Sequence, residues 1–146
     1  MGRKIVVTSG KGGVGKTTLT ASLGIAIAET GKKVVLVDAD IGLNNLDVVL
    51  AVENKVVYDV LDVISGKCRL KQALIQDVDN PTLYVLPSAK IQDSPLITAC
   101  SFRNVVDALA LNFDFVIIDC PAGIDNGFHR AVSAATEAIV VTTPHI

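Results

Sequence analysis

Short apolar runs alternate with longer segments of helical spacing along most of the chain. The apolar runs are rich in β-branched and aliphatic residues, which predicts buried strands over residues 4–8, 33–38, 82–86, 113–119 and 138–142. The longer segments carry apolar residues at intervals of three and four, which predicts helices over residues 16–30, 58–65, 70–76, 101–111 and 127–135. Residues 40–54 have no regular period, and they predict a loop with a short helix.

Strands that alternate with helices predict an α/β fold of three layers, α/β/α, around a mainly parallel sheet. No linker or repeat divides the sequence, so we expect residues 1–146 to form a single domain. The last predicted strand ends at residue 142, where such a fold would normally continue with further helix–strand units. We therefore expect this to be the N-terminal part of a larger domain whose C-terminal part is missing.

The composition agrees with that fold and excludes some partners. Half of the residues are hydrophobic but only 4% are aromatic, as suits a parallel sheet covered by helices. The net charge is −2, which gives no basic surface for nucleic acid. Cys68, Cys100 and Cys120 form no CxxC pair, and no apolar run reaches the roughly 18 residues of a membrane span. We expect a cytoplasmic protein.

A glycine-rich loop between the first predicted strand and helix carries the strongest motif. Residues 10–17 read GKGGVGKT and match the phosphate-loop pattern G-x-x-x-x-G-K-[ST]. Glycines let successive backbone N–H groups point at an anion, Lys16 supplies a cation for the outer phosphates, and the Thr17 hydroxyl suits Mg²⁺. The residues expected to bind nucleotide here are Gly10, Lys11, Gly12, Gly13, Val14, Gly15, Lys16, Thr17 and Thr18. The chain is therefore predicted to be a P-loop NTPase.

Lys11 is a second lysine inside the glycine run. It can be a solvated loop side chain, or a cation aimed at a phosphate of its own or of a facing subunit. The residues alone leave both interpretations open.

Three acidic residues end predicted strands. Asp38 and Asp40 follow one strand and Asp119 ends another, and the carboxyl ends of parallel strands are where ligands bind. Asp119 has the Walker B pattern of an acid that holds Mg²⁺ directly or through water. Asp38 and Asp40 are candidates for ordering metal-bound water or positioning the attacking water, with capping of neighbouring loops as the alternative.

A glycine follows the Walker B acid closely and completes the candidate site. Gly123 permits close backbone approach to a γ-phosphate, as in a switch loop that distinguishes ATP from ADP. His129 and His145 have no partners at ligand spacing and are interpreted as surface or packing residues.

With these motifs in view, the chain resembles the MinD/ParA family of deviant Walker A ATPases. The resemblance rests on residues 11–18, KGGVGKTT, which mark the superfamily. Residues 38–47, 66–75 and 117–128 read DADIGLNNLD, GKCRLKQALI and IIDCPAGIDNGF, and they favour the MinD branch over plasmid-partition relatives.

The resemblance implies a role for each site residue. Lys11 would cross to the phosphates of a partner subunit in an ATP-bound homodimer, Lys16 would be the loop lysine, and Asp40 would activate water. Thr17 and Asp119 would hold Mg²⁺. The resemblance also implies ATP rather than GTP, and it places Asn45 and Gly123 in the two switch regions.

The resemblance further implies partners. Family members dimerise with ATP, attach peripherally to the inner face of the cell membrane, and act with MinC-like and MinE-like regulators to place the division septum. Their membrane anchor is a basic amphipathic helix, and no segment of these residues has that make-up. We therefore expect no membrane binding by this chain alone.

Two other functional classes stay open. One is a nucleotide-binding fragment, or a ParA-like partition ATPase, that turns nothing over on its own. The other is a redox ATPase like the nitrogenase iron protein, which needs cysteines shortly after the Walker B acid and in another loop to hold an iron–sulfur cluster. The sequence disfavours this class, because Cys120 directly follows Asp119 and no second cysteine is suitably placed.

Overall fold

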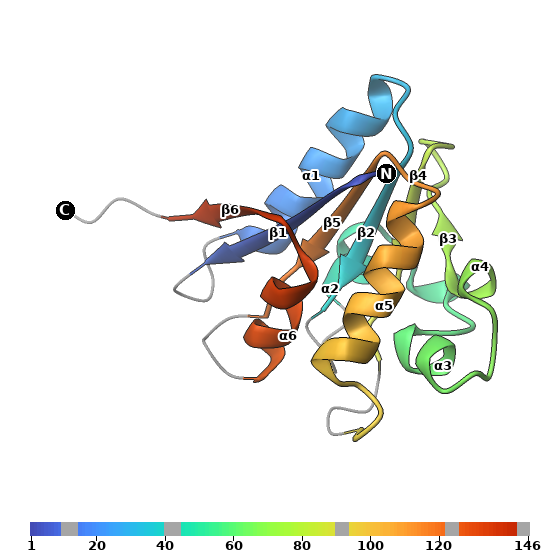
Figure 1. Ribbon diagram of the computed structural model, residues 1–146. Coiled ribbons are helices and arrows are strands. Elements are labelled where there is room, and N and C mark those ends of the chain that lie inside the picture. The colour runs from blue at the N-terminus through green and yellow to red at the C-terminus, as the bar shows by residue number, and fades with distance from the viewer. Residues whose placement is uncertain (10–14, 40–44, 90–93, 122–125, 143–146) are drawn as a thin grey trace.

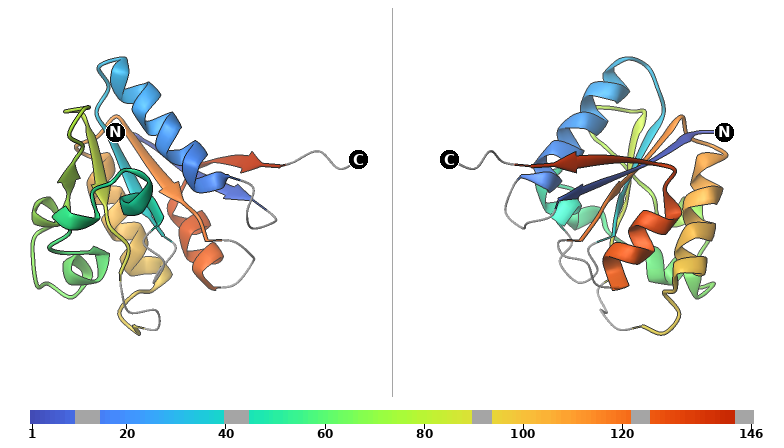
Figure 2. Two further views of the ribbon diagram at one scale, coloured as in Figure 1. Left: turned by 180° about the vertical axis from the view of Figure 1, so that it is seen from behind. Right: turned by 60° about the vertical axis from the view of Figure 1, so that its left-hand side comes forward.

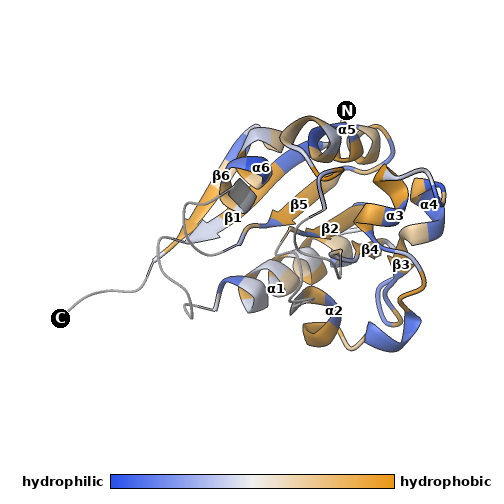
Figure 3. Cartoon of the chain, turned by 90° about the horizontal axis from the view of Figure 1, so that it is seen from below, coloured by the Kyte–Doolittle hydropathy of each residue, from blue (hydrophilic) through white to orange (hydrophobic). Residues whose placement is uncertain are grey.

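The computed structural model describes residues 1–9, 15–39, 45–89, 94–121 and 126–142 (Figure 1). A six-stranded sheet forms its middle layer, with α1 and α2 on one face and α5 and α6 on the other (Figure 3). The predicted three-layer α/β/α arrangement is confirmed.

The sheet is parallel except at one edge. Its strand order is β3-β4-β2-β5-β1-β6, and only the β3–β4 pair is antiparallel. The strands are β1 (Arg3–Ser9), β2 (Val34–Asp38), β3 (Ile75–Gln76), β4 (Leu83–Leu86), β5 (Phe115–Asp119) and β6 (Glu137–Val141).

The helices fall between these strands. They are α1 (Lys16–Glu29), α2 (Asn45–Val49), the 3-10 turn η1 (Glu53–Lys55), α3 (Val60–Ile64), α4 (Leu70–Ala73), α5 (Ala99–Ala110) and α6 (Asn126–Ala134). Of the helices that the structure describes, none has the length and apolar character needed to cross a membrane.

The helix predicted over residues 70–76 is wrong in its second half. Helix α4 ends at Ala73, Leu74 is extended, and residues 75 and 76 form the antiparallel edge strand β3. Ile75 pairs with Val85 of β4 and is buried there. Antiparallel pairing with the next strand along the chain has overridden the local helical spacing.

The core lies on both faces of the sheet because successive side chains of each central strand point to opposite faces. Val7, Leu36 and Ile117 pack with α1 on one face. Val6 and Ile118 point to the other face and pack with α5 and α6. A view from behind and one turned by 60° show α1 and α5 as separate layers with the sheet between them (Figure 2).

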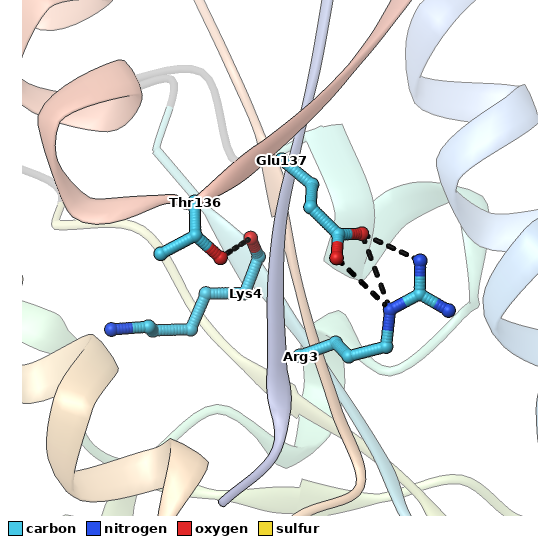
Figure 4. A network of polar contacts seen from close by, with 4 residues as sticks. All are labelled: Arg3, Lys4, Thr136 and Glu137. Carbon is cyan, nitrogen blue, oxygen red and sulfur yellow. Dashed lines mark hydrogen bonds and ion pairs between the residues drawn. The ribbon is translucent and has the colours of Figure 1, made fainter.

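Strand β6 lies at the edge of the sheet and is tied to β1. Arg3 Nη2 and Nε donate to the Glu137 carboxylate, with Nη2 2.6 Å from Oε2 (Figure 4). Next to this pair, the Thr136 backbone N–H donates to the Lys4 carbonyl at 3.0 Å. No other strand among the described residues pairs with the outer edge of β6.

Candidate functional site

Three neighbouring strands bring their carboxyl ends to one edge of the sheet. In the strand register, Asp119 at the end of β5 lies opposite Val7 of β1 and opposite Asp38 at the end of β2. The backbone is fixed there by long-range hydrogen bonds, in which Ala39 N–H donates to the Asp119 carbonyl and Cys120 N–H donates to the Val7 carbonyl. Asp38 and Asp119 therefore lie side by side at the carboxyl ends of adjacent strands.

Helix α1 starts at the same edge, at Lys16, within the phosphate-loop motif of residues 10–17. Gly15 precedes it with φ +78°, a left-handed conformation that side chains rarely adopt, so glycine suits this position. No side chain caps the helix among the described residues. The N–H groups of its first turn are donors that suit an anion, and the helix dipole favours negative charge there.

The first residue of α1 makes the central contact of the site. Lys16 Nζ forms an ion pair and hydrogen bond with Asp119 Oδ1. Lys16 is only 8% exposed and Asp119 is fully buried. The cation of the phosphate loop is therefore held by the Walker B acid.

The second residue of α1 binds the same carboxylate. The Thr17 hydroxyl donates to Asp119 Oδ2 at 2.8 Å. Each carboxylate oxygen of Asp119 thus accepts from its own donor, one from Lys16 and one from Thr17. The Thr20 hydroxyl donates to the Lys16 carbonyl at 2.8 Å within the first turn of α1.

This donor set fits a nucleotide with a divalent cation. A hydroxyl and a carboxylate in hydrogen-bond contact are the oxygen ligands that Mg²⁺ prefers. A buried ammonium group at a helix N-terminus suits phosphate oxygens. No group of three or more His, Cys, Asp or Glu side chains gathers at metal-ligand spacing within the described ranges.

Asp38 lies beside the pair but makes a different contact. Its carboxylate is fully buried, and Oδ2 accepts from the Leu46 N–H at 3.1 Å in the first turn of α2. This contact links the end of β2 to the first turn of α2.

Thr18, a predicted nucleotide-binding residue, is exposed on the first turn of α1. Other predicted site residues lie outside the described residues: Gly10, Lys11, Gly12, Gly13, Val14, Asp40 and Gly123. Of the two histidines interpreted as surface or packing residues, His129 is exposed on α6 and His145 lies outside the described residues.

The sequence predicted that Lys16, Thr17 and Asp119 lie at one edge, but not that they touch. It also missed the Leu46 N–H, a backbone group with no side-chain signature. The contact of Lys16 and Thr17 with Asp119 depends on the strand order. Because β5 lies next to β1, its terminal acid faces the start of α1.

A family model described as AAA domain matches residues 2–146. Among curated proteins, the chain is 54% identical to the septum site-determining protein MinD of Bacillus subtilis strain 168 over 147 residues, which is 100% of this chain and 55% of that protein. The chain therefore spans about half the length of the curated relatives it matches.

Solved structures give the same result. The chain matches MinD of Pyrococcus horikoshii OT3, complexed with Mg-ADP, with a TM-score of 0.87 and 38% identity over 99% of this chain and 59% of that one. The MinC:MinD cell division complex of Aquifex aeolicus matches with a TM-score of 0.83 and 46% identity over 94% of this chain and 55% of that one. The predicted resemblance to MinD is confirmed.

Proposed function

Because the chain belongs to the AAA domain family, we propose that it forms the nucleotide-binding part of a MinD-type cell-division ATPase. The observation that supports this most is the convergence of Lys16 and Thr17, at the start of α1, on the buried carboxylate of Asp119. We further propose that residues 1–146 act as one P-loop domain.

The phosphates of ATP would lie at the start of α1. Backbone N–H groups of residues 10–18 would surround them. The Lys16 ammonium group, which now contacts Asp119, would also contact the outer phosphates. Thr17 and Asp119 would hold Mg²⁺, with Asp38 and Asp40 as further acidic groups around it. Mg²⁺, when bound, supplies positive charge that offsets the charge on the phosphates.

The ion pair gives this proposal a physical rationale. A lysine buried without an anion would be strongly disfavoured, so the site keeps Asp119 as an internal counter-ion until phosphate arrives. Nucleotide then replaces one anion with another, and Asp119 becomes available to the metal.

The switch function is also part of the proposal. Lys11 would reach the phosphates of a facing subunit in an ATP-bound homodimer, Asp40 would position the attacking water, and Gly123 would sense the γ-phosphate. Hydrolysis of ATP to ADP and phosphate would then set the lifetime of the dimer.

The partners proposed follow from the relatives. The Aquifex aeolicus MinC:MinD complex supports a MinC-like partner. A MinE-like regulator, a cytoplasmic location and peripheral attachment of the whole protein to the inner face of the membrane are further parts of the proposal.

Calorimetric titration of the purified chain with Mg·ATP, with Mg·GTP as control, tests the central claim. We expect saturable binding that prefers ATP, and a loss of at least about 100-fold in affinity for Lys16→Ala, because that change removes the principal phosphate cation. Lys32→Ala is the matched control, since Lys32 is an exposed lysine away from the site. Circular dichroism must show that each variant is folded. Equal affinity of a folded Lys16→Ala variant would contradict the assignment.

The alternative function is nucleotide binding without turnover, as a fragment or as a ParA-like partition ATPase. Phosphate release and light scattering distinguish the two. A switch predicts slow phosphate release and an ATP-dependent dimer that Lys11→Ala abolishes while binding persists. Binding with neither property would favour the alternative.

A further inference from the structure

A pocket of about 700 Å³ opens at the edge of the sheet opposite to Lys16 and Asp119. It lies where β2 and β5 begin, between the α4–β3 segment and the end of α5. Its lining residues are Lys33, Arg69, Leu70, Lys71, Leu74, Gln76, Tyr84, Leu109, Asn112 and Phe113.

The pocket has an apolar interior and a cationic rim. Leu109 and Phe113 are buried at its base, and Leu70, Leu74 and Tyr84 are half-buried along its sides. The exposed lining residues are polar: Lys33, Arg69, Lys71, Gln76 and Asn112. No Asp or Glu lines it within the described part of the chain, so the three positive side chains surround an apolar space with no acid in its lining.

Lys33 is held over this space. Its Nζ lies 4.8 Å from the centre of the Phe113 ring and 5.8 Å from the centre of the Tyr84 ring. The two rings meet edge to face with their centres 5.5 Å apart. The Lys33 backbone N–H donates to Asp114 Oδ2 at 2.9 Å, which fixes the other end of the residue. Cation–π contact positions the ammonium group without neutralising it.

The other two cations are also uncompensated. Among the described residues, the ion pairs involve Arg3, Lys4 and Lys16, and none involves Lys33, Arg69 or Lys71. A single unpaired lysine beside a pocket can be an ordinary solvated surface residue. Three cations around leucines and aromatic rings, with no acid in the lining and a space of ligand size, are better explained as a ligand site.

We propose that this pocket binds a small amphipathic anion, with a carboxylate or phosphate group on an apolar body. The anionic group lies between Lys33, Arg69 and Lys71, and the apolar body lies against Leu70, Leu74 and Tyr84. The Asn112 amide offers a hydrogen bond at the rim, whereas Gln76 Nε2 already donates to the Pro81 carbonyl at 2.8 Å. The site is separate from the nucleotide site, since it lies at the other end of β2 and β5.

Protein-observed NMR titration of the full 146-residue chain tests the proposal with three probes. They are 2-naphthoate, 1-naphthyl phosphate and the neutral 2-naphthalenemethanol. We expect both anions to shift the amide signals of residues 69–76, 84 and 112–113, and the neutral probe to bind at least about 10-fold more weakly. A preference between the two anions identifies the group that the rim favours.

Charge-removing variants complete the test. Lys33→Gln with Arg69→Gln should weaken both anions at least about five-fold, whereas Lys32→Gln with Lys67→Gln, which removes the same charge from lysines that do not line the pocket, should have no effect. The spectrum of each variant shows whether it is folded, and Lys71→Gln gives a milder second variant. The proposal fails if the neutral probe binds as well as the anions, if both pairs of variants behave alike, or if the shifts map only to residues 15–20.

Discussion

The contact between Lys16 and Asp119 has a role before any nucleotide binds. Both groups are buried, and each offsets the charge of the other where little water reaches them. Burying two charges is costly, so such a pair adds little to stability by itself, but removal of one partner leaves an uncompensated charge.

We therefore expect Lys16→Ala to lower the free energy of unfolding by about 3 kcal/mol in the absence of nucleotide, because Asp119 is left with Thr17 as its donor. Urea unfolding followed by circular dichroism measures the change. Lys32→Ala, which removes an exposed lysine, should change it by less than about 0.5 kcal/mol. Similar losses in the two variants would show that replacing Lys16 in the buried pair costs no more stability than replacing an exposed lysine.

At this scale the sequence predicted identities better than contacts. The spacing of the phosphate loop and the strand-ending acid singled out Lys16, Thr17 and Asp119, because both motifs are local. The hydrogen bond from Leu46 N–H to Asp38 could not be predicted, since it depends on how α2 folds back over the end of β2.

One glycine sets how closely α1 approaches the sheet. Gly24 faces Leu36 of β2, and a Cβ at this position would lie 2.7 Å from Leu36 Cδ2. Leu36 is fully buried, so it has little room to move away. The helix needs a residue without a side chain here, although glycine disfavours helix formation.

Gly24→Ala therefore sets two effects against each other. Alanine favours the helix by about 1 kcal/mol, and overpacking of the core costs about 1–3 kcal/mol. We expect a net loss of stability of about 1 kcal/mol by chemical denaturation. The matched control is Ala26→Gly at an exposed position of α1, which should lose about 1 kcal/mol through propensity alone. A stabilised Gly24→Ala protein would mean that Leu36 adapts freely.

The edge strand β6 depends on an exposed ion pair whose contribution varies with pH. The hydrogen bond from Arg3 lowers the pKa of Glu137 below its ordinary value of 4.5, and the same contact raises the pKa of Arg3. Because the folded-state pKa of Glu137 is depressed, the stabilisation is present above pH 4.5 and is lost as the pH falls through the folded value.

Glu137→Gln should therefore lower the free energy of unfolding slightly at about pH 6, and the difference from the parent should shrink as the pH falls below 4.5. Salt should shrink it as well, since exposed pairs are screened. Denaturation at a series of pH values measures it. A difference that grows on acidification would contradict this account.

At the level of elements, most helices and strands could be predicted because short β-branched runs mark the strands and longer segments without proline lie between them. The exception is β3, since two residues are too few for any pattern and the preceding Leu70–Ala73 helix suggested continuation. Its strand character comes from pairing with β4, which lies seven residues further on.

For the molecule as a whole, the sequence predicted a mainly parallel sheet but not its order. The order places β5 between β2 and β1, although β5 is distant from both in the chain. This arrangement brings Asp38, Asp119 and the start of α1 together at one edge. Only the long-range pairing, recorded in registers such as Val34 with Phe115, could establish it.

The open edge of β6 has a consequence for handling this chain in solution. Backbone donors and acceptors on that side have no strand partner among the described residues, and Val140 is 63% exposed beside them. An unprotected apolar edge is a template for strands of other molecules. Concentrated samples should therefore form clusters by strand pairing. We expect Val140→Lys to reduce this association in dynamic light scattering while the melting temperature stays unchanged. If the variant associates as before, the molecules associate through a surface other than the β6 edge.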